Sequence, residues 1–208
     1  MTGTSRTLTI SEISVTNGDT VSVAIASPRE FTISGSPKTV VVYRAFNIGM
    51  AYQGGRIAYI YQSGDSGYVP GQTHGLIAST ADLSTGIEWK NGDYTTTGAA
   101  GVALGTGQAN TTTIVNNQGE GSYAAKICND YTNPDTGTGV YSDWYLPSRD
   151  ELEKLYLNKA EIGGFTSFYW TSSEKGDGTA CGINFFTGEI FESMDKRSAL
   201  NVRAVRSF

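Results

Sequence analysis

Histidine and cysteine are scarce in this chain: its 208 residues include one His and two Cys. Cys128 and Cys181 lie far apart and form no Cys-x-x-Cys pair, so with His74 they supply too few ligands for a zinc site. One histidine without a Gly-x-Ser-x-Gly turn also leaves little scope for a Ser-His-Asp triad. We expect His74 at a loop or strand end. The cysteines are expected as buried free thiols, with a disulfide as the alternative.

Charged side chains are scarce as well, at 17% of the residues, and the formal net charge is −5. An acidic chain without a run of Lys or Arg is not suited to nucleic acid. No apolar stretch approaches the length of a membrane-spanning helix, so we expect no membrane insertion. Residues Met1–Arg6 lack the apolar core of a secretory signal. A virion component would need no such signal, because lysis releases it.

Glycine, in contrast, is abundant at 26 residues and, with many Ser and Thr, favours turns and β-structure. Residues 1–45 show alternating apolar patterns and an Asn17-Gly18 turn signal, which predict a small all-β segment. It is too short for a large core of its own. We therefore expect it to serve attachment or assembly, and the protein to form a homo-oligomer. The expected strands are Arg6–Val15, Thr20–Ala26, Glu30–Ile33 and Thr39–Tyr43.

Residues 46–208 show strand patterns, then two helical regions, then strand patterns again, which predicts one α+β domain. Early strands are expected at Arg56–Gln62, His74–Ala78 and Thr85–Trp89, and a long ordered loop at Asn91–Gln108. The first helical region is expected to contain two helices: Asn110 or Thr111 caps the first, and Ser122 caps the second. Ser148 and Glu151 form a capping box for the second. Final strands are expected at Phe168–Ser172, Ala180–Phe186 and Ala199–Val205, with a Thr187-Gly188 hairpin turn.

Three motifs in one order carry a resemblance to a bacterial and phage family. Tyr141–Leu152 contains Asp-Trp, Leu-Pro and Glu-Leu, Tyr169–Glu174 reads Tyr-Trp-Thr-Ser-Ser-Glu, and Asn201–Arg206 reads Asn-Val-Arg-Ala-Val-Arg. From about residue 46 the chain resembles the DUF1566 family, which includes the C-terminal domain of a Legionella collagen-like adhesin. The resemblance implies a C-type-lectin-like domain, in which two helical regions pack on a twisted antiparallel sheet. The signature residues are Trp144, Leu146, Pro147, Glu151, Trp170, Arg203 and Arg206.

These signature residues are open to a structural and a functional interpretation. Trp144, Leu146 and Trp170 could line a binding surface, but large rings with apolar neighbours favour the core. Arg203 and Arg206 could bind carbohydrate or carboxylate. We favour ion pairs inside the fold, with acids such as Glu151 or Glu174, because arginine suits buried bidentate pairs.

Catalysis is not expected. Formylglycine-generating relatives of this fold use paired cysteines near the end of the domain, which Cys128 and Cys181 do not match. The calcium-binding motifs Glu-Pro-Asn, Gln-Pro-Asp and Trp-Asn-Asp do not occur either. No cofactor or metal is therefore expected, and calcium is left open without a motif that indicates it.

Loops on a rigid scaffold are the best candidates for ligand contact. They are Asn91–Gln108, Asn133–Tyr141, Lys175–Thr179 and Phe191–Ser198. We hypothesise a non-catalytic receptor-binding module of a phage virion (tail fibre or capsid decoration) or of an extracellular surface, recognising a bacterial surface glycan or protein. The alternative is a decoration protein that binds only neighbouring virion or surface subunits. The candidate contact residues are Tyr94, Tyr141, Asp177, Phe191, Glu192 and Lys196.

Overall fold

A computed structural model describes residues 22–25, 41–44 and 46–208 of the chain. The chain divides into two units, residues 1–46 and 47–208, which are described separately. In the first unit, β1 (Ser22–Ile25) pairs in parallel with β2 (Val41–Arg44). Both strands fall within or next to predicted strands. The other strands predicted before residue 46, and the Asn17-Gly18 turn, lie outside the described residues.

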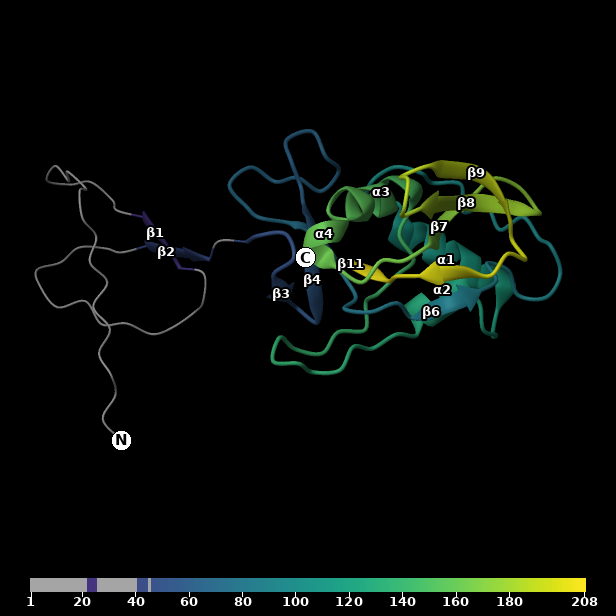
Figure 1. The fold of residues 1–208 in the computed structure, drawn as a ribbon, viewed down its shortest axis with the longest axis horizontal. Helices are drawn as coiled ribbons and strands as arrows, with labels where there is room; N and C mark the ends of the chain where they lie inside the picture. The colour runs from purple at the N-terminus through teal and green to yellow at the C-terminus, as the bar shows by residue number, and fades with distance from the viewer. Residues whose placement is uncertain (1–21, 26–40, 45) are drawn as a thin grey trace, which may run out of the picture. The chain divides into compact units, whose positions relative to one another are not determined.

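Four short strands of the second unit form an antiparallel sheet in the order β11-β5-β4-β3. Figure 1 labels β3, β4 and β11 of this sheet near the C-terminus. They are β3 (Ala51–Tyr52), β4 (Gly55–Ile60), β5 (Gly75–Ala78) and β11 (Val205–Ser207). Every residue of β5 is buried. This sheet joins the start of the unit to the end of the chain.

A second sheet has five strands in the order β6-β10-β7-β8-β9, antiparallel except for the parallel pair of β10 and β7. They are β6 (Ser84–Ile87), β7 (Phe168–Glu174), β8 (Thr179–Asn184), β9 (Ile190–Asp195) and β10 (Leu200–Val202). β7 and β8 are nearly all buried, whereas β9 forms an edge and is partly exposed. The β9 edge therefore belongs to the surface of the unit.

The C-terminal strands differ from the prediction in two places. The expected strand Ala199–Val205 is two strands, because Val202 pairs with β6 and Val205 pairs with β5 of the other sheet. The expected loop Phe191–Ser198 is largely β9, which pairs along β8. Strands near the other predicted positions are present, and Gly188 adopts a φ of +81° in the turn before β9.

The helices are α1 (Gly107–Gln118), α2 (Ala124–Asn129), α3 (Arg149–Leu157) and α4 (Lys159–Ile162). α3 begins at the predicted capping box: Ser148 accepts from the Glu151 amide, and Glu151 accepts from the Ser148 amide. α1 begins three residues before Asn110, because the Asn110 side chain binds the backbone of Gly101 instead of capping the helix. α3 packs on β4 and on β7 and β8, so it links the two sheets.

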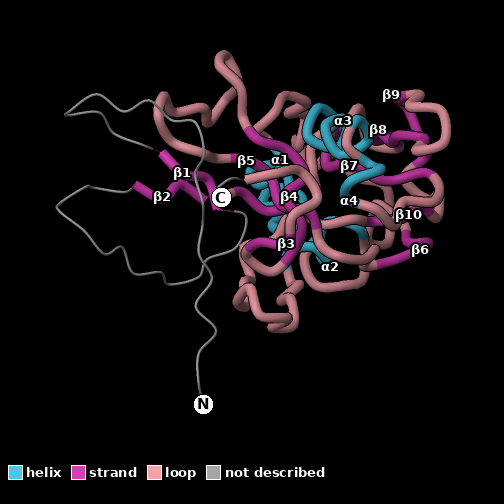
Figure 2. Tube along the Cα trace, turned by 60° about the vertical axis from the view of Figure 1, so that its left-hand side comes forward, coloured by secondary structure: helices cyan, strands magenta, loops and turns pink. Residues whose placement is uncertain are grey.

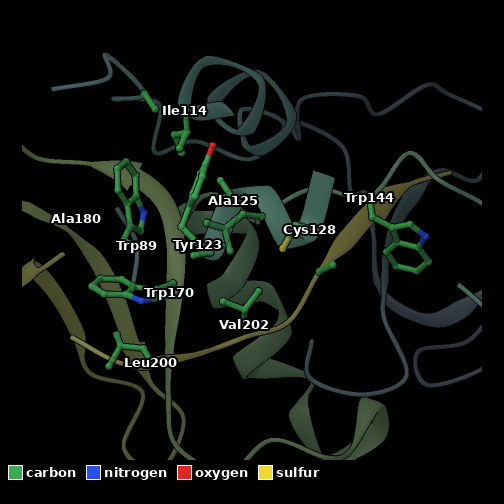
Figure 3. Close-up of a cluster of buried hydrophobic side chains, with 14 of the residues drawn as sticks. Trp89, Ile114, Tyr123, Ala125, Cys128, Trp144, Trp170, Ala180, Leu200 and Val202 are labelled. Carbon is green, nitrogen blue, oxygen red and sulfur yellow. The ribbon is translucent and has the colours of Figure 1, made fainter. Parts of the chain in front are cut away.

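Buried aromatic side chains fill the interior between these layers. Trp89 and Trp170 are both fully buried, and Figure 3 shows them with Tyr123 at one end of a cluster that extends to Trp144. Leu146 is buried in the same cluster. Helices with mainly antiparallel sheets confirm the α+β class, and the C-type-lectin-like fold stays a prediction of the resemblance. Within the described ranges, none of the helices combines the length and apolarity that crossing a membrane requires.

Candidate ligand-binding face

Residues 88–106, called the 88–106 loop below, contain neither helix nor strand, yet their backbone is fixed to the five-stranded sheet. The anchor is the carboxylate of Glu174, the last residue of β7. It accepts the backbone amides of Thr97 and Gly98 at 2.7–2.9 Å and the Thr97 hydroxyl at 3.1 Å. Charge-assisted hydrogen bonds of this kind take the place of a sheet partner for the loop backbone.

Lys196 completes this anchor from inside the protein. Its ammonium donates to Glu174 at 2.6 Å and to the carbonyl oxygen of Thr95 at 2.8 Å, and it lies 4.5 Å from the centre of the Trp89 ring. Burial raises the pKa of Glu174, but the Lys196 hydrogen bond and the two loop amides outweigh it and lower the pKa. The Lys196 side chain is fully buried, which corrects the prediction that it contacts a ligand at the surface.

A second buried carboxylate, that of Glu151 on α3, fixes the other end of the 88–106 loop. It accepts the backbone amides of Ser148 at 2.8 Å and of Gly105 at 2.9 Å. The Ser148 hydroxyl in turn donates to the carbonyl oxygen of Ala103 at 2.9 Å. Burial raises the pKa of Glu151 in spite of these donors. At Gly107 a Cβ would lie 2.1 Å from a Glu151 oxygen, so the close approach requires glycine.

Directly before the Glu174 anchor the loop presents Tyr94, which is 40% exposed. Its hydroxyl donates to Asp195 at the end of β9 at 2.7 Å, and the Arg197 guanidinium lies 5.2 Å from the centre of its ring. The turn between β7 and β8 approaches the ring at Gly178, next to the predicted contact residue Asp177. We call Tyr94, Asp177, Asp195 and Arg197 the Tyr94 face.

Charges on the Tyr94 face hold one another in place. The hydrogen bond from Arg197 and then the one from Tyr94 hold the pKa of Asp195 far below its usual range. Asp195 and Arg197 lie in the predicted contact loop Phe191–Ser198, on either side of the predicted contact residue Lys196. Lys196 and Arg197 lie in the turn after β9, so strand alternation does not apply to them, and no local sequence pattern marks Asp195 and Arg197 as the residues that contact Tyr94.

Glu192 and Phe191 lie on β9 beside the Tyr94 face. Glu192 accepts from Lys175 at 2.6 Å and from Arg149 at 3.1 Å, and the Lys175 hydrogen bond contributes most to lowering its pKa. The Phe191 ring packs on Phe168 with 5.6 Å between the ring centres. The structure thus brings Tyr94, Asp177, Phe191 and Glu192 to one sheet edge.

Tyr141 lies in a different setting. Its ring is covered by the Arg206 guanidinium, 4.1 Å from the ring centre, and Arg206 donates to both oxygens of Asp143 at 2.6 and 2.8 Å. Arg206 also donates to Gln53 at 2.5 Å, beside the four-stranded sheet. Tyr141 is therefore part of a structural stack rather than of the Tyr94 face.

Arg203 is buried and pairs with Asp82 at 2.6 Å, while it also donates to the carbonyl oxygen of Gly164 at 2.7 Å. Both arginines of the closing motif thus form ion pairs within the fold. The prediction that Glu151 or Glu174 pairs with these arginines was wrong, because both carboxylates bind the backbone of the 88–106 loop instead. The actual partners precede the arginines by 121 and 63 residues, a separation that local patterns do not reveal.

Cys128 and Cys181 are buried free thiols, as expected. Burial raises the pKa of both, that of Cys181 to about 12, so neither is a thiolate at neutral pH. His74 lies directly before β5, between the carbonyl oxygen of Phe208 and the side chain of Gln72. Among the residues that the structure describes, no three His, Cys, Asp or Glu side chains are grouped so that they could hold a metal ion.

Comparison with protein families places most of the second unit in a known family. A family model described as the Lcl C-terminal domain matches residues 78–206, from the end of β5 to the middle of β11. Lcl denotes the Legionella collagen-like protein. The match contains the Glu174 and Glu151 anchors and the whole Tyr94 face. A search of curated proteins found no match.

Proposed function

Because the chain belongs to the Lcl C-terminal domain family, we propose that it is a surface adhesion module that binds its ligand through the Tyr94 face and catalyses no reaction. The observation that carries the proposal is the fixation of the 88–106 loop by Glu174 and Lys196. A loop that is ordered before binding loses less conformational entropy when the ligand arrives. The side chain it presents, a partly exposed tyrosine, offers large contact area with few rotatable bonds.

The ligand in this proposal is a glycan or protein on the surface of a bacterium. Tyr94 offers a ring and a hydroxyl, Asp195 an acceptor and Arg197 a donor fork, and the three lie within contact of one another. Such a mixed, open face suits the hydroxyl and amide groups of a cell surface better than a small buried substrate. Display on a phage virion, as a homo-oligomer, is the setting that we propose, since several weak sites together bind a cell surface strongly.

The test is binding of the fluorescently labelled, full-length protein to a panel of intact bacteria, with and without a chelator. We expect saturable binding to a few strains and at least a tenfold loss of affinity in Tyr94→Ala. Phe186→Ala is the matched control, because Phe186 is 69% exposed in the turn between β8 and β9, at the other end of β9 from Asp195. Periodate treatment of the cells would remove a glycan ligand, and protease treatment a protein ligand.

Equal binding by wild type and Tyr94→Ala would contradict the assignment to this face. Failure to bind any strain would contradict the adhesion proposal and favour the alternative, a decoration protein that contacts only neighbouring subunits. Loss of binding in the chelator would show that a metal ion takes part.

A further inference from the structure

A cavity of about 350 Å³ lies between residues 61–74, called the 61–74 loop below, and the end of the chain. It is shallow and largely open to solvent, and its volume falls near the lower end of the ~300–1,000 Å³ range of small-molecule sites. Tyr68 and Val69, at the tip of the same loop, are 37% and 39% exposed. The lining residues are Tyr61, Ser66, Gly67, Val69, His74, Gly105, Ser207 and Phe208.

The walls of this cavity are held by hydrogen bonds from behind. The His74 ring lies 3.1 Å from the carbonyl oxygen of Phe208 and 2.9 Å from the Gln72 side-chain oxygen. The hydroxyl of Ser207 lies 3.0 Å from that of the buried Tyr145. His74, Ser207 and Phe208 are thus tied to the surrounding structure, whereas Ser66, Gly67 and Val69 belong to the exposed part of the 61–74 loop.

The lining combines apolar ring surfaces with hydroxyl groups and contains no Asp, Glu, Lys or Arg. Phe208 lines it with a partly exposed ring that packs on Tyr52, and Tyr61 lines it with a ring that is 9% exposed. Val69 offers an apolar side chain, and Ser66 and Ser207 offer hydroxyls that both donate and accept. A charged ligand would lose its hydration here without gaining an ion pair, which is costly. The cavity therefore favours an uncharged ligand that has both an apolar face and hydroxyl groups.

The geometry points to a second binding site in this cavity, which takes a single uncharged pyranose ring, such as a terminal sugar unit of a neutral glycan. A pyranose has one face of C–H groups, which packs on an aromatic ring, and a rim of hydroxyls, which bonds to serine hydroxyls. The site is separate from the Tyr94 face, because Gly105 and Tyr94 lie near opposite anchors of the 88–106 loop. It does not depend on the proposed function.

The experiment is a titration of the isotope-labelled full chain, followed by backbone amide NMR shifts. The probes are the methyl glycosides of glucose, galactose, mannose and N-acetylglucosamine, each raised to about 50 mM so that a dissociation constant of ~1–10 mM is detected. We expect at least one glycoside to give saturating shifts that centre on Gly67, Gly105 and Ser207. Ser66→Phe fills the cavity mouth from an exposed position and should weaken binding at least tenfold.

Ser63→Phe is the matched control, since Ser63 is exposed in the same loop but does not line the cavity. The proposal is overturned if no glycoside gives saturating shifts, or if the shifts persist unchanged in Ser66→Phe. A parallel titration with phenol distinguishes the ligand class: saturation by phenol and by none of the sugars would assign the cavity to an aromatic side chain and overturn it too. Cell binding through Tyr94 is unaffected by any of these outcomes, so the two proposals fail separately.

Discussion

Two long loops among residues 47–208 contain no regular secondary structure, but they are held in different ways. Figure 2 draws the 61–74 loop in pink between β4 and β5. The 88–106 loop buries Trp89, Thr97 and Ala99 and receives hydrogen bonds from two interior carboxylates. The 61–74 loop is exposed along most of its length, and its main internal contact is the partly buried Asp65. We infer that hydrogen bonds to buried carboxylates hold the 88–106 loop more firmly than the 61–74 loop, although neither has regular secondary structure.

The largest loss of unfolding free energy is expected when the Lys196 ammonium is removed. Lys196→Met leaves the Glu174 carboxylate buried without its cation, and loss of one partner of a buried pair costs about 3–5 kcal/mol of unfolding free energy. Urea unfolding followed by tryptophan fluorescence measures this cost, since Trp89 lies against Lys196. A loss below about 1 kcal/mol, typical of exposed pairs, would place the 88–106 loop in the same class as the 61–74 loop.

A smaller loss is expected when the Glu151 anchor is crowded. Gly107→Ala places a Cβ 2.1 Å from a Glu151 oxygen and 2.8 Å from the Ser148 amide, and overpacking of this kind costs about 1–3 kcal/mol. Thermal unfolding of the variant measures it. Gly86→Ala is the control, because there the nearest atom would be 3.7 Å away. Equal melting temperatures for the two variants would contradict the account of this anchor.

The two anchoring carboxylates should respond to pH with opposite sign. The pKa of Glu174 in the folded protein is below its ordinary 4.5. The carboxylate therefore adds to the unfolding free energy above pH 4.5, and this stabilisation is lost as the pH falls through the folded pKa. The folded pKa of Glu151 is raised above 4.5, so stability falls as the pH rises from 4.5 through the folded value.

The pH dependence of two variants tests this. The loss of unfolding free energy caused by Glu174→Gln should shrink as the pH falls from about 5 to about 3. The loss caused by Glu151→Gln should be larger at about pH 4 than at about pH 7. Urea unfolding of both variants and of wild type at these pH values supplies the comparison. If the losses caused by the two substitutions changed with pH in the same direction, the opposite roles of the two carboxylates would be refuted.

The smallest effect is expected in the 61–74 loop. The Asp65 carboxylate accepts hydrogen bonds from the Tyr59 hydroxyl and the Gln62 amide, each at 2.7 Å. Burial of the Tyr59 ring, and then the hydrogen bond to Asp65, raise the pKa of Tyr59 to about 12. Asp65→Ala should lower that pKa while it reduces the unfolding free energy by about 1 kcal/mol or less. Ultraviolet titration of tyrosine in the variant and in wild type tests this. An unchanged Tyr59 pKa would show that Asp65 does not hold the loop.

Local signals predicted local structure well in this chain. The α3 capping box and the strand of β5 were predicted within a few residues, because their causes lie within one turn or one alternating run. The family was recognised from three motifs and is confirmed by the family match. The ordered character of the 88–106 loop was also predicted, although its anchors were not.

What the sequence did not reveal depends on contacts between distant residues. Lys196 was expected at the surface because it lies in the predicted loop Phe191–Ser198, but Glu174, 22 residues earlier, gives it a partner in the interior. The C-terminal strand was predicted as one element, yet it changes sheets around Arg203, which pairs with Asp82. The cavity beneath the 61–74 loop is lined by segments from three parts of the chain.

Amide hydrogen exchange, resolved residue by residue, tests the central claim most directly. If buried carboxylates fix the 88–106 loop, the amides of Thr97, Gly98 and Gly105 exchange as slowly as those of the core strand β8. The other amides of the 61–74 loop then exchange near the rate of an unstructured chain. The exceptions are Tyr61, Asp65, Tyr68 and Gln72, which donate to carbonyl oxygens within the loop, and Gln62, which donates to the Asp65 carboxylate. Rapid exchange at Thr97, Gly98 and Gly105 would contradict the claim, since it would show that the Glu174 and Glu151 hydrogen bonds do not hold the loop.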